Sequence, residues 1–352
     1  MLHVERTLLD ILEKARHRQP ITLEECKYLL RQPATSYESA LIRGTSDSLV
    51  REKTGNAGII IGQVCTDVHP CNAGCKFCSF GDERVSVQSA RLQKQAMQAA
   101  IDGFRRNDDL YGIYLMTMAD TEPEFLLDMV AYARANTPAT TQIWVNIGDH
   151  DGIYFKELAA AGAQGAYHVC RLREGTDTRL DPRTRYATME NIRAAGLDLF
   201  SCCEPIGPEH TVDELAENIL LCYDLGVTQF GAMRRIAVPG TPLGEMGQIS
   251  DLQMAHVMGC VGLVYASVDS ARFFGVHEPC QLGYLAGANF VTAETGANPR
   301  DTAYDTSKGG RGWDMERCRK LLFECGFTSL LRGDESRIAL DYNYLKKTDS
   351  LI

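Results

Sequence analysis

The sequence lacks any excess of positive charge: its 36 lysines and arginines are outnumbered by 46 aspartates and glutamates, so the formal net charge is −10. Such a chain has no electrostatic footprint for nucleic acid and would be repelled by an anionic membrane surface. It also lacks an apolar run approaching the ~18 residues of a membrane span, and residues 1–20 have an amphipathic helical pattern rather than that of a signal peptide. We therefore expect a cytoplasmic protein with no nucleic-acid or membrane partner.

The 13 cysteines lack the arrangement of a small secreted disulfide protein, because they are scattered over strand and helix patterns. We expect them to be reduced. Cys71, Cys75 and Cys78 stand apart, since only three and then two residues separate them. Soft thiolates select iron–sulfur clusters, zinc or copper(I). Three thiolates can hold three corners of a four-iron cluster and leave the fourth iron open.

Zinc is the alternative for this motif. A structural zinc ion needs four ligands, and His69 or Cys65 just upstream could supply the fourth. The context favours the cluster, because the apolar run 58–64 is typical of a buried strand and the cysteines fall in the glycine-containing polar loop after it. The aromatic Phe77, directly before the last cysteine, is a further specific feature.

Strand and helix patterns alternate from about residue 58 to about residue 330. Such alternation with right-handed crossovers gives a parallel sheet, and eight units without a long break favour a closed (βα)8 TIM-type barrel of the α/β class. Residues 1–57 are expected to form a helical extension, 58–330 the barrel and 331–352 a C-terminal tail. The predicted strands span 58–65, 111–118, 141–148, 164–172, 197–204, 227–237, 271–275 and 288–294.

Capping boxes mark the start of three helices between these strands. They are Thr121-x-x-Glu124, Thr211-x-x-Glu214 and Ser250-x-x-Gln253. In barrels of this kind the chemistry sits at the C-terminal ends of the strands. The cysteine loop follows the first predicted strand, so motif and fold point to the same end of the barrel.

The cysteine spacing, with Phe77 before the last thiol, resembles the signature of the radical S-adenosylmethionine (SAM) superfamily. The resemblance implies a [4Fe-4S] cluster on Cys71, Cys75 and Cys78, whose open iron chelates the amino and carboxylate groups of SAM. In such enzymes an electron from the cluster cleaves SAM to methionine and a 5′-deoxyadenosyl radical, which removes a hydrogen from a small-molecule substrate. A reducing partner such as flavodoxin or ferredoxin is then expected.

Within the superfamily, most of the chain is similar to the biotin synthase group, which also includes the hydrogenase maturase HydE and methylornithine synthase. The similar segments are 173–180, 239–243, 285–289 and Asn298-Pro299. The resemblance implies that Glu174, after the fourth strand, contacts the ribose or ammonium of SAM. Arg171 or Arg173 would then bind its carboxylate, because a carboxylate pairs well with a guanidinium fork. A surface ion pair is the alternative for these residues.

Three further residues are placed by the same resemblance. Asp120 ends the second strand and is the expected acceptor for the SAM ammonium group; the alternative is that it caps the next helix. Glu204 ends the fifth strand and should face cofactor or substrate. Val238, after the sixth strand, stands where relatives pack adenine, or it is a plain core valine.

Candidate substrate-binding residues come from strand geometry. Arg234 and Arg235 are adjacent on the sixth strand, so only one of them can enter the barrel. A buried charge is costly unless paired, which makes the inward arginine a candidate anchor for an anionic substrate. Arg272 on the seventh strand and His277, in the cluster His277-Glu278-x-Cys280, are further candidates near the top of the barrel. Metal binding is a weaker alternative for that cluster, and no catalytic residue is identified.

The expected reaction is a radical rearrangement, fragmentation or bond formation on a small metabolite or cofactor precursor. One alternative is sulfur insertion, as in biotin or lipoyl synthesis, which needs a second cluster with thiolates of its own. Biotin synthase holds its second cluster with cysteines on three of its strands. Here the strands at 111–118 and 141–148 have no cysteine, and the third cysteine position falls on Phe200. Another set of thiols could still converge, and its candidates are Cys170, Cys202, Cys203 and Cys280.

A second alternative is a non-catalytic iron–sulfur redox protein. Such a carrier would need neither an eight-stranded barrel nor an open iron.

Overall fold

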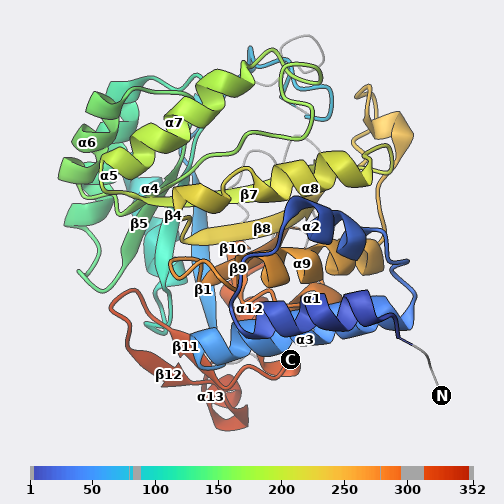
Figure 1. Cartoon of the computed structure of the whole chain (residues 1–352). Helices are drawn as coiled ribbons and strands as arrows, with labels where there is room; N and C mark the ends of the chain where they lie inside the picture. The colour runs from blue at the N-terminus through green and yellow to red at the C-terminus, as the bar shows by residue number, and fades with distance from the viewer. Residues whose placement is uncertain (1–3, 79, 82–88, 278, 295–312, 349–352) are drawn as a thin grey trace.

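A closed barrel of eight parallel strands forms the centre of the molecule (Figure 1). The computed structural model describes residues 4–78, 80–81, 89–277, 279–294 and 313–348. The last barrel strand pairs back to the first over five residues, from Ile59 opposite Phe290 to Gln63 opposite Glu294. In the order of the sheet, the barrel strands are β1 (Ala57–Cys65), β4 (Gly112–Met116), β5 (Gln142–Asn146), β6 (Gly165–Tyr167), β7 (Asp198–Ile206), β8 (Gln229–Arg234), β9 (Phe273–His277) and β10 (Phe290–Glu294). The predicted (βα)8 TIM-type barrel is confirmed.

All eight predicted strands exist, although most are shorter than predicted. The largest difference is β6, which ends at Tyr167 although the pattern extended to residue 172. Beyond Tyr167 the chain still donates backbone hydrogen bonds to β7, from the His168 N–H to the carbonyl of Phe200 at 2.9 Å and from the Leu172 N–H to that of Glu204 at 2.8 Å. The chain then turns into a loop that carries several of the predicted SAM contacts.

Helices between the strands cover the outside of the barrel (Figure 1). They are α4 (Lys94–Phe104), α5 (Pro123–Ala135), α6 (Gly152–Ala161), α7 (Pro182–Ala194), α8 (Val212–Leu220), α9 (Asp251–Tyr265) and α10 (Gln281–Tyr284), with α12 (Met315–Glu324) after the last strand and the 3-10 turns η1 (Tyr223–Leu225) and η2 (Gly244–Met246). α9 is buried on all sides over residues 254–265. An all-round apolar helix must be covered on both faces, and the N-terminal extension supplies the second cover.

That extension consists of α1 (Arg6–Arg16), α2 (Leu23–Leu30) and α3 (Tyr37–Thr54), which lie along α8 and α9 (Figure 1). α1 buries one stripe of residues that includes Leu8 and Leu12, as an amphipathic helix should. Lys27 of α2 and Asp213 of α8 form an ion pair at 2.8 Å. None of the helices within the described part of the chain is long and apolar enough to cross a membrane.

Two of the three predicted capping boxes are confirmed, at Thr211 and at Ser250. The box predicted at Thr121 is wrong. α5 begins at Pro123 with Glu122 as its N-cap, because proline is favoured in the first turn. The Thr121 hydroxyl instead donates to Asp67 at 2.7 Å, which ties the end of β4 to the segment after β1.

Residues after the barrel form a hairpin at the N-terminal end of the strands. β11 (Ser329–Leu331) pairs in parallel with the start of β1 and antiparallel with β12 (Arg337–Ala339). α13 (Tyr342–Lys347) follows, and these elements lie together at the lower end of Figure 1. The side chain of Glu335 in the hairpin turn forms an ion pair with Arg272 at 3.0 Å.

An aromatic layer fills the middle of the barrel. Its rings make tilted or edge-on contacts, with centroids 4.0 Å apart for Trp144 and Phe200 and 5.3 Å apart for Tyr114 and Trp144. Such offset geometry suits the ring quadrupoles. The members of the layer are Tyr111, Tyr114, Trp144, Phe200, Phe273 and Phe290. Glu278 and Asn298-Pro299, named above, lie outside the described residues.

Candidate active site

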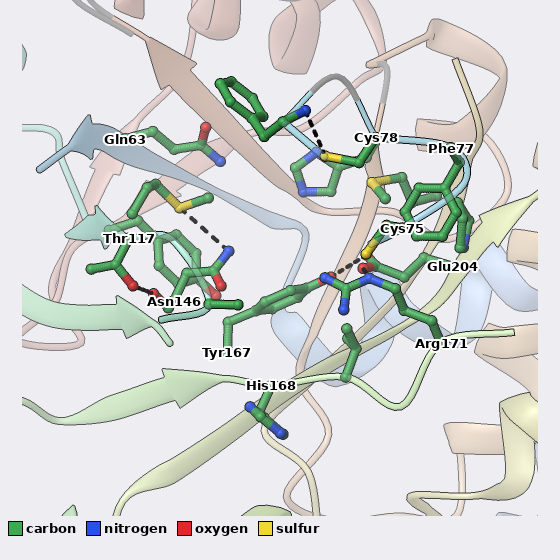
Figure 2. Close-up of a pocket in the computed structure, with 18 of the residues that line it drawn as sticks. Gln63, Cys75, Phe77, Cys78, Thr117, Asn146, Tyr167, His168, Arg171 and Glu204 are labelled. Carbon is green, nitrogen blue, oxygen red and sulfur yellow. Dashed lines mark hydrogen bonds and ion pairs between the residues drawn. The ribbon is translucent and has the colours of Figure 1, made fainter. Parts of the chain in front are cut away.

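The cysteine loop follows β1 and lies at the C-terminal mouth of the barrel. Its base is closed by a hydrogen bond from the Cys71 N–H to the carbonyl of Phe80 at 2.8 Å. The Cys71 and Cys75 thiols are buried and Cys78 is half-buried, and all three line the same pocket. The Phe80 N–H points at the Cys78 sulfur, 3.4 Å away (Figure 2). Burial raises the pKa of the Cys71 thiol, and burial raises that of Cys75 to about 12.

Loops from two other strands hold the cysteine loop in place. The backbone N–H of Lys76 donates to the carbonyl of Asp177 at 2.9 Å, and its ammonium group donates to the Asp177 carboxylate at 3.2 Å. The Arg179 N–H donates to the carbonyl of Ala73 at 2.8 Å, and the Leu243 N–H to that of Lys76 at 3.1 Å. The three thiols are therefore presented by a loop whose backbone is fixed on both flanks.

We expect Lys76→Ala to loosen this loop and speed the loss of a bound cluster to a chelator about fivefold, because it removes a charge-assisted bond of about 1 kcal/mol. The decay of the visible absorbance measures the rate. Lys94→Ala is the matched control, since Lys94 forms a comparable ion pair with Asp128 at 2.7 Å far from the loop. Equal decay rates in the two variants would contradict the role given to Lys76.

Seven predicted residues other than the cysteines line the pocket, and four do not. Those that line it are Phe77, Arg171, Glu204, Arg234, Arg235, Val238 and His277. Asp120, Arg173, Glu174 and Arg272 are not among the lining residues.

Arg171, Glu204 and Tyr167 form a connected group beside the cysteines (Figure 2). The Arg171 guanidinium is 3.2 Å from the carboxylate of Glu204, which also accepts a short hydrogen bond from the Tyr167 hydroxyl. Burial and the neighbouring Glu204 carboxylate raise the pKa of Tyr167 well above its ordinary value. Burial opposes the charge on Arg171, but the neighbouring anionic groups, Glu204 first among them, together outweigh burial and raise the pKa of the guanidinium. Arg171 therefore stays charged close to Cys75, and the Glu204 carboxylate balances that charge.

Glu174 and Arg173 turn away from the pocket. Glu174 accepts hydrogen bonds from the Arg171 N–H at 2.9 Å and the Thr178 hydroxyl at 2.6 Å, and lies 3.6 Å from Arg185. Arg173 has a positive φ of 54° and pairs with Glu214 at the start of α8. Neither side chain lines the pocket, because the turn after β6 directs them into the surrounding loops, and their contact with SAM stays a prediction.

Asp120 lies at the edge of the site. Its carboxylate is 3.7 Å from the His69 imidazole, and its charge contributes to the raised pKa of Cys71, after burial. Asp120 is not the N-cap of α5, which is Glu122. It is close to the cysteine loop without lining the pocket in this arrangement.

Each of the two adjacent arginines forms an ion pair with a carboxylate of the protein. Arg235 is fully buried and pairs with Glu209, whose second oxygen it meets at 2.9 Å. Arg234 pairs with Asp251 at the start of α9 at 2.5 Å and donates to the carbonyl of Ile249. Neither guanidinium is a free cation, although both border the pocket.

The predicted place of Arg272 is wrong. β9 begins only at Phe273, so Arg272 lies at the N-terminal end of the barrel, where it meets Glu335 and the hydroxyl of Tyr111. His277 ends the same strand and lines the pocket as predicted for the top of the barrel.

Polar side chains across the pocket from the cysteines were missed by the sequence analysis (Figure 2). Gln63 continues the inward-facing row of Ile59 and Ile61 on β1, and Asn146 follows Trp144 on β5 in the same way. A polar residue at an inward position of a buried strand is the signal that could have found them. The set comprises Gln63, Tyr114, Thr117, Asn146, Gln229 and Thr292, here called the polar ring.

His168 borders the pocket but points away from the cysteines (Figure 2). Its ring lies 3.1 Å from Asp149 and 3.1 Å from the carbonyl of Ile147. Burial lowers the pKa of His168 to about 4, so the ring is neutral at pH 7. Its role is to fix the loops after β5 and β6.

The donor set suits a cluster better than a single ion. In the part of the chain that the structure describes, no three histidine, cysteine or acidic side chains gather tightly enough to hold one metal ion. A four-iron cluster spreads its thiolates over separate irons. The alternative zinc ligands are directed elsewhere, since the Cys65 thiol donates to the carbonyl of Asp67 at 3.2 Å and His69 is 3.6 Å from the Asp67 carboxylate.

The cysteines considered for a second cluster are not brought together. Cys202 points into the barrel towards Tyr167, whereas Cys203 faces the helical layer near Cys26. Cys280 precedes α10, and the Cys170 sulfur contacts the carbonyl of Pro182. Because neighbouring strand residues face opposite ways, Cys202 and Cys203 cannot serve one site inside the barrel.

The chain shares its fold with solved structures that include methylornithine synthase, a member of the group that the sequence resembles. A comparison with solved structures places the chain beside methylornithine synthase (PylB), with a TM-score of 0.75 and 14% identity over 90% of this chain and 96% of that one. HydG, a maturase of the [FeFe]-hydrogenase, superposes with a TM-score of 0.74 and 13% identity over 93% of this chain and 76% of that one. HydG from Carboxydothermus hydrogenoformans gives 0.70 and 14% over 92% and 79%.

At these identities the likeness concerns the fold. No protein-family model matches the chain, and a search of curated proteins finds no match.

Proposed function

We propose that this protein is a radical SAM enzyme acting on a small molecule. The observation that carries the proposal is the position of Cys71, Cys75 and Cys78, which line one pocket at the C-terminal mouth of a closed barrel. A [4Fe-4S] cluster on these thiols would supply the electron that cleaves SAM to methionine and a 5′-deoxyadenosyl radical able to take hydrogen from a substrate. The burial of Cys71 and Cys75 fits this chemistry, because it would limit the access of water to a cluster held there.

The chain's own residues would bind and orient SAM. Arg171 offers a guanidinium fork for the SAM carboxylate, held in place by its contact with Glu204. Asp120, beside the cysteine loop, is the candidate partner for the SAM ammonium group. Val238 and Phe77 line the pocket and would pack against the adenine and the cluster loop respectively.

The reaction we favour is rearrangement, fragmentation or bond formation rather than sulfur insertion. Sulfur insertion needs a second cluster near the substrate, and Cys202 and Cys203 face opposite sides of β7. We further propose that the enzyme works in the cytoplasm and receives its electron from a small reducing partner such as flavodoxin or ferredoxin.

The test is SAM cleavage by protein reconstituted anaerobically with iron and sulfide. With a strong reductant, we expect 5′-deoxyadenosine and methionine in equal amounts, measured by chromatography, even without added substrate. A protein that binds a four-iron cluster but forms no 5′-deoxyadenosine would support the alternative of an electron carrier.

A further inference from the structure

The polar ring lies on the far side of the pocket from the cysteines and is made of neutral groups. Gln63, Asn146 and Gln229 contribute amides, while Thr117 and Thr292 contribute hydroxyls. They come from different strands, so their side chains converge on one space inside the barrel. The aromatic layer lies beneath them. Tyr114 belongs to both sets, because its aromatic ring is part of the layer and its hydroxyl group is part of the polar ring.

Two members of the ring have buried polar atoms with no hydrogen-bond partner among the described residues. These are the Tyr114 hydroxyl and the Gln229 side-chain oxygen, and their residues are only 4% and 3% exposed. A buried polar group without a partner costs about 1–3 kcal/mol, so it needs an explanation. Both residues line the pocket, and a ligand that bonds to them there would remove this cost.

Of the other ring members, Asn146 is weakly engaged through its side-chain amide, whereas Thr117 is not. The side-chain amide nitrogen of Asn146 meets the sulfur of Met116 at 3.7 Å, and a thioether sulfur is a poor acceptor (Figure 2). The Thr117 hydroxyl donates to the backbone carbonyl of Asn146 at 2.6 Å. The Asn146 amide therefore keeps hydrogen-bonding capacity for a ligand. Tyr114, Gln229 and Asn146 thus each have a polar atom that a ligand in the pocket could engage.

The charges around the pocket are satisfied by the protein itself. Of the four arginines that line it, Arg171 is the one assigned above to the SAM carboxylate, and the other three face carboxylates of the protein in the pairs Arg185–Asp149, Arg234–Asp251 and Arg235–Glu209. His277 and Glu294, which also line the pocket, have interactions of their own. An anionic ligand placed on the ring would lack a free cation and would pay the cost of a buried unpaired charge.

We propose that the substrate bound on the polar ring is an uncharged compound that carries hydroxyl or amide groups, without a free carboxylate, phosphate or ammonium group. Tyr114 and Gln229 hold it by hydrogen bonds at the bottom of the pocket. Such a site favours this class because a ligand lacking hydrogen-bonding groups would leave the two polar atoms unpaired. This inference rests on the proposed function and replaces the anionic substrate expected from Arg234 and Arg235.

The experiment uses reconstituted protein, SAM and reductant with four pools of defined compounds of similar size. The pools contain neutral polyols and amides, carboxylates, phosphates, and amines. We expect only the neutral pool to stimulate 5′-deoxyadenosine formation, by about tenfold. Stimulation by a charged pool, or by none, overturns the proposal. The reaction without any pool separates the two hypotheses, because no 5′-deoxyadenosine there would refute the proposed function itself.

Two variants then test whether the active compound binds on the polar ring. Tyr114→Phe removes only the unpartnered hydroxyl and should fold as well as the parent, yet raise KM about tenfold for the active neutral compound. Gln229→Leu should raise KM similarly. Gln142→Leu is the matched control, because the Gln142 amide donates to the carbonyl of Gly333 at 2.7 Å, at the opposite end of the barrel. An unchanged KM in both Tyr114→Phe and Gln229→Leu overturns the assignment of this ring.

Discussion

The triple variant Cys71→Ala, Cys75→Ala, Cys78→Ala should bind no iron after anaerobic reconstitution and should form no 5′-deoxyadenosine, whereas the parent should bind about four irons per chain. The three thiols are the proposed cluster ligands, and all three line the pocket at the barrel mouth. Without them nothing holds the cluster, and SAM has no iron to bind. Iron and sulfide analysis with Mössbauer spectroscopy checks the first result and chromatography the second.

Two single variants serve as controls for this experiment. Cys65→Ser keeps a donor for the carbonyl of Asp67, and Cys202→Ser changes the thiol inside the barrel. Both should retain about four irons. Two or four irons remaining in the triple variant would show a second cluster, and the sulfur-insertion alternative would then replace the reaction favoured here.

Glu209→Leu should lower the free energy of unfolding by about 3–5 kcal/mol, because it leaves the guanidinium of Arg235 buried without its carboxylate. The Arg235 side chain is 1% exposed and that of Glu209 7%, so solvent cannot replace the lost partner. Urea unfolding followed by circular dichroism gives the value. The double variant Glu209→Leu, Arg235→Met should recover most of the loss, because it removes both charges.

Asp251→Ala provides the matched control on the neighbouring arginine. The Asp251 side chain is 46% exposed, so breaking its pair with Arg234 should cost no more than about 1 kcal/mol. If Glu209→Leu were no more destabilising than Asp251→Ala, Arg235 would not depend on Glu209. It would then be available to bind an anionic substrate, and the neutral polar ring would lose its main support.

The barrel and the cysteine loop could be predicted from the sequence because their signals are local. Buried parallel strands are continuous apolar runs, as in β1, and the alternation with helices fixes their order. The spacing of Cys71, Cys75 and Cys78 is likewise visible within eight residues. These features need no knowledge of what lies opposite them in space.

Side-chain directions beyond the strand ends could not be predicted in this way. The alternation of side chains along a strand ends at Tyr167, where β6 ends. The following turn, with a positive φ at Arg173, directs Arg173 and Glu174 into the surrounding loops. Arg272 was misplaced because β9 starts one residue later than Arg272. The partners of Arg234 and Arg235 come from the start of α9 and from the loop after β7, which no local pattern relates to β8.

The aromatic layer and the hairpin below it close the N-terminal end of the barrel, so that the pocket opens at the C-terminal end. The rings of Trp144, Phe200 and Phe273 occupy its cross-section, and Glu335 of the hairpin turn sits beneath them. Among the described residues, a compound on the polar ring therefore has its way in and out at the C-terminal mouth, where the cysteine loop lies. If SAM were bound at that mouth, it would stand between the polar ring and solvent, and the substrate would have to bind before it.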